Sequence, residues 1–182
     1  MSRNAPELRR FEDQVLVHLD VLYRTALRLT GTAADAEDLV QETCLRALQA
    51  FDQLKYPHAA RAWVFSILRS IFLRQAERSR QARLSLKDLD EAVLGQAPTE
   101  ERASPMEQAL LEEVRTATLR LPAPYREALV LAHIGGFSYR EMAQILEVPL
   151  GTVMSRLFRA RRMVRAALME PVGSHAPVEP ER

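Results

Sequence analysis

The side chains best suited to chemistry in this 182-residue chain are arginines near its C-terminus. Five of them, at positions 156, 159, 161, 162 and 165, lie between Pro149 and Leu168, where no acid occurs. Like charges three residues apart destabilise an isolated helix unless a polyanion neutralises them. The number of arginines, taken by itself, is equally well explained by a charged helix face that is exposed to solvent. We favour DNA binding because the run contains no compensating acid.

A second basic stretch runs from Arg61 to Arg83 and holds six Arg against one Glu, which suits contact with a nucleic-acid backbone. The loop before it contains Lys55, Tyr56 and His58. Cations and an aromatic face are the chemistry that stabilises a base outside its stack. Tyr56 and His58 are equally compatible with ordinary loop residues. Trp63, on a packing stripe, is predicted to belong to the core.

Acidic residues gather in two places. Residues 35 to 42 hold four acids and no base, and from Asp88 to Glu113 there are eight acids and one Arg. A helix dipole explains acids in a first turn, such as Asp35 and Glu37, but explains Glu42 poorly. A solvated spacer is the simple explanation of the second block. The net charge of +1 is thus a near-cancellation of basic and acidic segments, and it does not argue against DNA binding.

The sequence offers no constellation for catalysis. The four histidines are scattered, at His18, His58, His133 and His175. No glycine-rich phosphate loop and no metal-ligand spacing occurs, so we expect neither an enzyme nor a cofactor. Because Cys44 is the single cysteine, an internal disulfide is excluded. We expect Cys44 to be a packed thiol, and the protein to be cytoplasmic. No run approaches the ~20 apolar residues of a membrane span, so we expect no membrane insertion.

The elements that position these side chains are all predicted to be helices. Apolar residues recur every three or four positions from Leu8 to Leu29, from Thr32 to about Leu54, and from about Ala59 to Ser79. These stripes predict a three-helix bundle. Further helices are predicted from Ser104 to Leu121, Tyr125 to Ile134, Ser138 to Leu146 and Pro149 to Met169. The last two are short helices joined by a tight turn, the pattern of a helix-turn-helix.

The predicted architecture is therefore all-α, with two small helical domains. The first occupies residues 1–80 and the second residues 104–170. A flexible acidic linker at 81–103 joins them, and a disordered tail follows at 171–182.

Residues 121–165, LPAPYREALVLAHIGGFSYREMAQILEVPLGTVMSRLFRARRMVR, resemble region 4 of the extracytoplasmic-function (ECF) sigma factors of bacterial RNA polymerase. DAEDLVQETCLRAL (35–48) and RAWVFSILRSIFLRQAERSRQ (61–81) resemble parts of region 2 of the same family. The resemblance implies a dissociable initiation subunit that binds core RNA polymerase and promoter DNA and is controlled by an anti-sigma factor. It implies no small-molecule substrate.

The resemblance also implies roles for particular residues. The −35 element of the promoter would be contacted by Thr152, Ser155, Arg156, Phe158, Arg159 and Arg162. The −10 element would be contacted by Lys55, Tyr56, His58, Arg61, Arg69, Ser70 and Arg74. Core polymerase would be bound by Asp35, Asp38, Gln41 and Glu42.

Four positions depart from the pattern of the family. Met154 stands where several relatives carry Arg, and Ser70 where Asn is common. Arg74 replaces Asn or Asp, and Glu147 occupies a turn position often held by Gly. We expect a shifted sequence preference at the −35 element and an altered contact at the −10 element.

Two other classes of protein fit parts of the sequence. An operator-binding helix-turn-helix regulator would explain residues 121–168, but it would leave the acidic helix, the arginine-rich third helix and the linker without roles. A helical adaptor that binds only proteins predicts no contact with DNA.

The resemblance also implies a role for the acidic linker. In the family, it would occupy the basic active-site and RNA-exit channel of the polymerase as a polyanion mimic.

Overall fold

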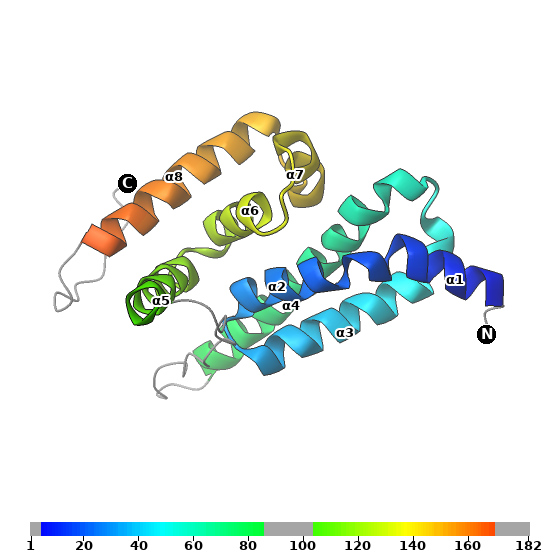
Figure 1. Ribbon diagram of the computed structural model, residues 1–182, viewed down its shortest axis with the longest axis horizontal. Coiled ribbons are helices and arrows are strands. Elements are labelled where there is room, and N and C mark those ends of the chain that lie inside the picture. The colour runs from blue at the N-terminus through cyan, green and yellow to red at the C-terminus, as the bar shows by residue number, and fades with distance from the viewer. Residues whose placement is uncertain (1–4, 86–103, 170–182) are drawn as a thin grey trace.

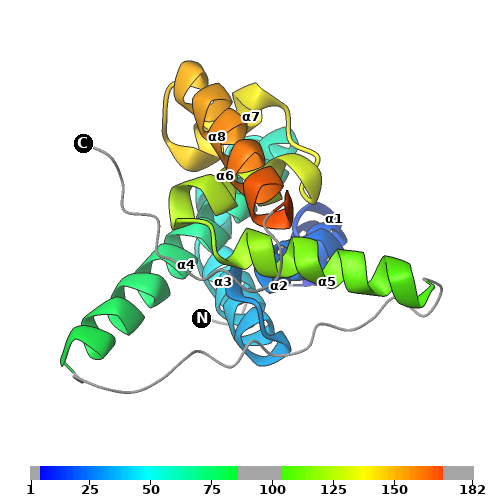
Figure 2. The same ribbon diagram turned by 90° about the vertical axis from the view of Figure 1, so that its left-hand side faces the viewer.

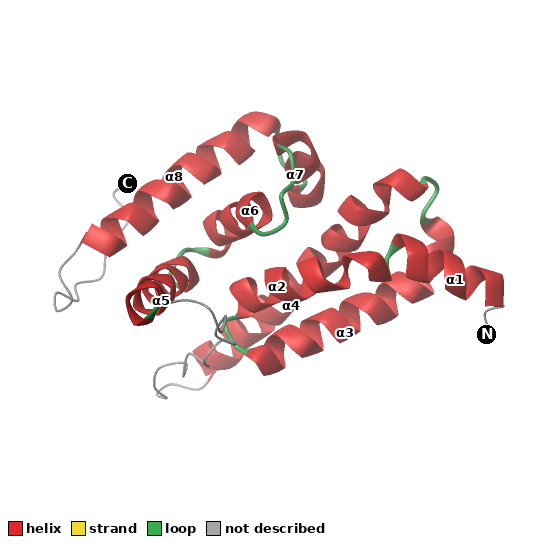
Figure 3. Cartoon of the chain, viewed as in Figure 1, coloured by secondary structure: helices red, strands yellow, loops and turns green. Residues whose placement is uncertain are grey.

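The computed structural model describes residues 5–85 and 104–169, which form helices joined by short turns without any strand (Figure 3). The N-terminal half contains α1 (Ala5–Gln14), α2 (Leu19–Thr30), α3 (Ala33–Gln49) and α4 (Ala60–Ser85). The C-terminal half contains α5 (Pro105–Leu119), α6 (Ala123–His133), α7 (Tyr139–Leu146) and α8 (Leu150–Met169). The all-α prediction is confirmed. Most of the predicted linker and the tail lie outside the described residues.

The single helix predicted from Leu8 to Leu29 is wrong in one respect, because the structure divides it into α1 and α2. A 3-10 turn, Leu16–His18, separates them. A 3-10 turn has fewer residues per turn than an α-helix, so it changes the phase of the apolar stripe. Leu22 is fully buried as a result, whereas Leu19 is 43% exposed. Packing of the apolar core therefore divides the single helix that the continuous periodicity predicts.

Local signals account for the ends of α2, α3 and α4. Gly31 ends α2 in the left-handed conformation, with φ 92°, and Thr32 caps α3 by accepting a hydrogen bond from the backbone N–H of Asp35. α3 ends at Gln49, before the predicted Leu54, because a 3-10 turn, Phe51–Gln53, follows it. α4 continues to Ser85, past residue 80 where we expected the first domain to end.

Each half has buried apolar side chains on its helices. In the N-terminal half Leu22, Leu39 and Phe65 are fully buried, as are Met142 and Leu157 in the C-terminal half. Two helices of the C-terminal half begin with a capping box. Ser104 caps α5 with Glu107, and Ser138 caps α7 with Glu141.

The two halves pack directly against each other. α5 and α6 lie against α2, and α7 lies against α4 (Figures 1 and 2). The buried residues of both halves form one cluster, in which the rings of Phe65 and Phe137 meet edge to face with centroids 4.7 Å apart. Sequence patterns predict each half but not this contact, which decides the surroundings of several predicted site residues.

Candidate nucleic-acid interface

The turn between α7 and α8 has the geometry of a helix-turn-helix. Glu147 ends α7 in the left-handed conformation, with φ 52° and ψ 44°, which is the conformation that Gly favours at this position. Val148 then donates a backbone hydrogen bond to the carbonyl of Ala143 at 3.1 Å. α8 begins just after Pro149. The turn is therefore preserved although this chain carries Glu.

α8 presents a polar face opposite its buried stripe. Ser155, Arg159 and Arg162 are exposed, and the ring of Phe158 is 69% exposed. Val153, Leu157 and Ala160 on the other side are buried, while Val164 is half-buried. Thr152 is half-buried at the first turn of the helix. The exposed guanidinium groups are donors for phosphates and base edges.

Arg156 lies apart from the other predicted residues of α8. It is half-buried, and its Nη1 is buried without a hydrogen-bond partner. Its charge acts on Glu127 of α6, a carboxyl that is 3% exposed. Burial raises the pKa of Glu127 above its ordinary value, and the guanidinium groups of Arg69 and Arg156 oppose that rise.

The loop before α4 is open to solvent. Lys55, Tyr56 and His58 are all exposed, and the Tyr56 ring stacks on the His58 ring with centroids 5.5 Å apart and planes at 30°. Trp63, by contrast, is partly buried against the core. The loop thus presents a pair of rings beside a cation, which is a surface on which a base can stack.

Two predicted DNA contacts on α4 instead face the C-terminal half. Arg61 donates a hydrogen bond to the carbonyl of Gly135, and its guanidinium lies 4.4 Å from the centroid of the Phe137 ring. Arg69 forms an ion pair with the buried Glu127 at 3.3 Å and approaches Glu147 at 4.0 Å. Both arginines therefore already have partners within the chain.

The remaining predicted residues of α4, Ser70 and Arg74, are exposed. Arg74 donates a hydrogen bond to the Ser70 hydroxyl at 3.2 Å. α4 consequently has one basic face covered by the C-terminal half and another that is free.

Two further arginines, which sequence patterns did not single out, join the halves. Arg126 donates a hydrogen bond to the carbonyl of Leu29 at 3.0 Å, and Arg115 donates one to the carbonyl of Gly31 at 3.2 Å. Arg115 is only 5% exposed. Because arginine is rarely buried without a partner, the carbonyl of Gly31 and the carboxylate of Glu112 together explain the position of Arg115. No local sequence pattern predicts these two hydrogen bonds, since the partners lie more than 80 residues apart.

The acidic residues predicted to bind polymerase lie on α3 in two different settings. Asp38 and Gln41 are exposed, whereas Asp35 accepts a hydrogen bond from the Thr32 hydroxyl at 2.6 Å as part of the helix cap. Glu42 is half-buried and pairs with Arg46 at 2.5 Å. Leu45, one turn after Gln41, is 56% exposed. An exposed leucine beside exposed polar groups is a feature that the stripe pattern missed.

Part of the predicted acidic linker block belongs to a helix. Glu107 caps α5, and Glu112 pairs with Arg115 at 2.5 Å. These acids therefore have structural roles in α5. None of the helices in residues 5–85 and 104–169 combines the length and apolarity needed to cross a membrane.

Cys44 is half-buried, and burial raises the pKa of its thiol. The raised pKa disfavours the reactive thiolate, in agreement with the packed thiol that the sequence predicts.

Two family descriptions match this chain, one in each half. Sigma-70 region 2 matches residues 15–82, and Sigma-70, region 4 matches residues 111–164. An operator-binding regulator is therefore not favoured, because that class leaves the first of these matches unexplained.

Whole-chain relatives agree with both matches. The ECF RNA polymerase sigma factor EcfG of Rhodopseudomonas palustris is 39% identical over 158 residues, covering 86% of this chain and 83% of the relative. SigL of Mycobacterium tuberculosis is 38% identical over 84% of this chain and 85% of the relative.

The fold agrees as well. The sigma factor RpoE of Bartonella quintana, solved in complex with the anti-sigma factor NepR, superposes with a TM-score of 0.71 at 30% identity, covering 88% of this chain and 97% of that one. The helical fold, the helix-turn-helix and the similar proteins all indicate the same family. The chain belongs to the ECF RNA polymerase sigma factors, a family of transcription initiation factors.

Proposed function

We propose that this protein binds core RNA polymerase and directs initiation at particular promoters. The observation that carries the proposal is the exposed face of α8, which presents Ser155, Phe158 and Arg159 from a helix-turn-helix. Such a helix fits the major groove with its side chains toward base edges.

Within this function, α8 reads the −35 element. Arg159 supplies base-edge donors, and Phe158 offers an apolar contact for a thymine methyl group. The Ser155 hydroxyl, which donates to the carbonyl of Thr152 at 3.0 Å, offers its oxygen as an acceptor. Arg162 and Thr152 bind phosphates, the latter near the positive N-terminal end of the helix. Arg156, which is half-buried beside Glu127, supports the helix and reaches a phosphate only if its side chain turns outward.

The N-terminal half handles the −10 element. Tyr56 and His58 stack with unpaired bases, and Lys55 neutralises a nearby phosphate. Ser70 and Arg74 are exposed on α4 and contact the DNA backbone. Arg61 and Arg69 are engaged by the C-terminal half, so they contact DNA only after that half leaves α4.

Core polymerase binds the exposed side of α3. Asp38 and Gln41 provide its polar contacts, and Leu45 adds an apolar one. Glu42 lies at the edge of this surface, whereas Asp35 chiefly caps the helix.

The proposed division of labour assigns residues 1–80 to polymerase and −10 binding and residues 104–170 to −35 binding. Residues 81–103 form the linker and 171–182 the tail. The protein acts in the cytoplasm without catalysis, cofactor or small-molecule substrate. Since the similar sigma factor RpoE was solved with the anti-sigma factor NepR, an anti-sigma factor is the proposed regulator.

Run-off transcription with core polymerase on a library of promoters tests the function. We expect initiation at a subset of promoters that share a −35 and a −10 element. Arg159→Ala should abolish this initiation, whereas Arg9→Ala, an exposed residue on α1, should not. Folded protein that directs no initiation with active core polymerase would overturn the proposal.

A further inference from the structure

A row of exposed apolar side chains runs along α8. Leu150, Met154 and Phe158 are 42%, 52% and 69% exposed, respectively. Side chains four residues apart lie one above the other on the same side of a helix, so these three form a continuous ridge. The core does not use this ridge, because the buried side chains of α8 belong to other rows of the helix. A contiguous apolar surface that packing leaves open is a candidate contact surface.

The surroundings of the ridge are basic. The next position along the same row is Arg162, and the neighbouring row holds Ser155 and Arg159, all of them exposed. No acid occurs between Pro149 and Leu168. Basic surroundings are complementary to a polyanion, and the ridge lies within the proposed DNA-binding face of α8.

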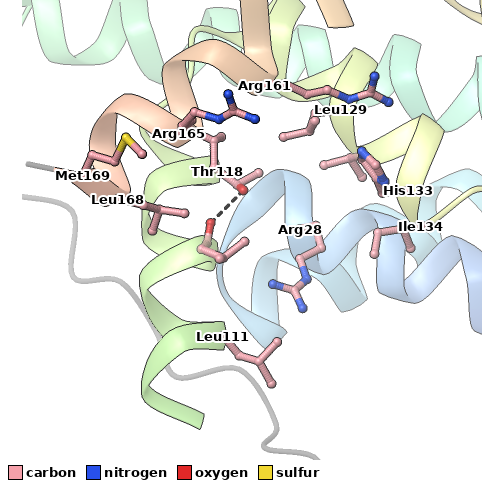
Figure 4. Close-up of a pocket in the computed structure, with 13 residues that line it drawn as sticks. Arg28, Leu111, Thr118, Leu129, His133, Ile134, Arg161, Arg165, Leu168 and Met169 are labelled. Carbon is pink, nitrogen blue, oxygen red and sulfur yellow. Dashed lines mark hydrogen bonds between the residues drawn. The ribbon is translucent and has the colours of Figure 1, made fainter. Parts of the chain in front are cut away.

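Two other arginines of α8 belong to a different row. That row begins with the buried Val153 and Leu157 and continues with Arg161 and Arg165. Both arginines line the pocket that α8 forms with α5 and α6 (Figure 4). They therefore lie on the side of α8 that faces these helices, and they are not part of the ridge.

The major groove of DNA carries apolar groups that match such a ridge. Each thymine presents a C5 methyl group there, beside its O4 acceptor, whereas the other three bases carry no methyl group. A methyl group is stabilised when an apolar side chain removes it from water. Methionine suits this contact because its unbranched, polarisable side chain adapts to irregular surfaces.

The spacing along the ridge also fits DNA. Residues four apart in an α-helix are separated by about 6 Å along its axis, whereas base pairs are stacked about 3.4 Å apart. When α8 lies along the major groove, Met154 and Phe158 therefore reach methyl groups about two base steps apart. Arg159, in the neighbouring row, reaches the O6 and N7 acceptors of a guanine beside them.

We infer that Met154 and Leu150 extend the contact of Phe158 with thymine into a ridge that reads methyl groups in one strand of the −35 element. This contact rests on the proposed function, within which it names the class of DNA sequence that α8 prefers. That class has at least two closely spaced thymines in one strand. Met154, which stands where several relatives carry Arg, is then a residue that determines specificity, because its side chain distinguishes thymine from the bases without a methyl group.

Deoxyuridine tests the role of the methyl groups, because it lacks the C5 methyl of thymine but keeps O4 and the same base pairing. The full-length chain first selects its preferred sequence from a library of random duplexes, so that the probe does not depend on initiation. Fluorescence anisotropy then compares this duplex with duplexes in which single thymines are replaced by deoxyuridine. We expect replacement at two positions of one strand to weaken binding by roughly three- to four-fold each.

Variants assign each methyl group to a side chain. Met154→Ala should bind the thymine duplex about three-fold more weakly and should lose the response to deoxyuridine at one of the two positions. Phe158→Ala should lose the response at the other position. Met106→Ala, on α5, is the matched control, since it removes a methionine that is 84% exposed, and it should keep the affinity and both responses of the wild type. Thermal melts establish that each variant is folded.

Several outcomes would overturn the inference. Selection of sequences without closely spaced thymines would do so, as would equal binding of the thymine and deoxyuridine duplexes by the wild type. A full response to deoxyuridine at both positions in Met154→Ala would also contradict the ridge. Self-association of the wild type that Met154→Ala abolishes would show that the ridge binds protein instead of DNA.

Run-off transcription separates this inference from the proposed function. Initiation that is equally strong on promoters with thymine and with deoxyuridine in the −35 element would overturn only the reading of methyl groups. A chain that distinguishes the two duplexes in binding but directs no initiation with active core polymerase would overturn only the proposed function.

Discussion

Glu147 illustrates how one residue tolerates an unfavourable backbone conformation. It is the only non-glycine residue with positive φ among the described residues, and its side chain is 82% exposed. A left-handed conformation costs a non-glycine residue about 1 kcal/mol. The distant ion pair with Arg69 offers little compensation, because exposed pairs contribute little.

Replacement of Glu147 by Gly should therefore stabilise the protein. We expect Glu147→Gly to raise the free energy of unfolding by about 1 kcal/mol, offset in part by the greater entropy of the unfolded chain. Glu147→Gln is the control, since it removes the charge but retains the strain, and it should change stability by less than about 0.5 kcal/mol. Urea denaturation measures both. A loss of stability in Glu147→Gly would contradict the strain.

Gly31 is the opposite case, because its conformation requires glycine. Its φ is 92°, and an added Cβ would lie 3.0 Å from Cδ1 of Leu119 in α5. Gly31→Ala should lower the free energy of unfolding by roughly 1–2 kcal/mol through strain alone. Gly151, in α8, has nothing within 4 Å of its Cβ position, so Gly151→Ala should be neutral or stabilising by up to about 1 kcal/mol. In thermal denaturation, the midpoint temperature should fall in Gly31→Ala and should stay the same or rise in Gly151→Ala.

At the scale of elements, α7 depends on its cap. Ser138 donates hydrogen bonds to Glu141 from its hydroxyl, at 2.6 Å, and from its backbone N–H, at 2.8 Å. These bonds hold the pKa of Glu141 below its ordinary value. The ionised carboxylate therefore stabilises the folded state at pH values above the ordinary carboxyl pKa, and this contribution is lost as the pH falls through the lowered value.

The pH dependence of this cap can be measured. Glu141→Gln should lower the free energy of unfolding by about 1 kcal/mol at neutral pH. The difference from wild type should shrink as the pH falls below 4.5, the ordinary carboxyl value, because protonation removes the charge from wild type as well. Glu113→Gln, on the exposed side of α5, should leave stability within about 0.5 kcal/mol. A difference for Glu141→Gln that is constant across this range would contradict the cap.

Neighbouring arginines of α8 lie on different sides of the helix, and only one of these sides belongs to the proposed DNA-binding face. Arg162→Ala should weaken binding to −35 duplex DNA and reduce the slope of log K against log salt by about 1, because one phosphate contact is lost. Arg161→Ala, one residue away but about 100° around the helix, should leave the slope unchanged. Fluorescence titrations at several salt concentrations compare the two. Equal effects of both variants would mean that the faces are not distinct.

At the scale of the whole molecule, a buried ion pair joins the two halves. Glu127 is 3% exposed and pairs across the interface with Arg69. Removal of one partner of a buried pair costs about 3–5 kcal/mol, because the other charge stays buried and unpaired. Such a loss favours separation of the halves, which returns Glu127 to water.

Arg69→Glu should therefore open the molecule. We expect a larger radius of gyration in small-angle X-ray scattering, while the helix content in circular dichroism is retained. Arg74→Glu makes the same change of charge on the free face of α4 and should leave the radius as in wild type. An unchanged radius in Arg69→Glu would show that the apolar contact between Phe65 and Phe137 holds the halves together without the ion pair.

The sequence alone determined that the chain is helical, where most of its helices lie, and the family. Ser104 and Ser138 begin helices because hydrogen bonds three residues away are local, and Val153 and Leu157 are buried because a stripe must face a core. The exposed predicted residues of α8 were likewise predictable, since they lie opposite that stripe.

Only the tertiary structure decided which of these helices meet. Packing of the helices divided α1 from α2, covered Arg61 and Arg69, and buried Arg115 and Glu127. Arg69 and Glu127 are 58 residues apart, and no periodic pattern encodes such a pair. Local patterns specify which side of a helix is apolar, whereas the packing of two helical units depends on the shape and charge that both present together.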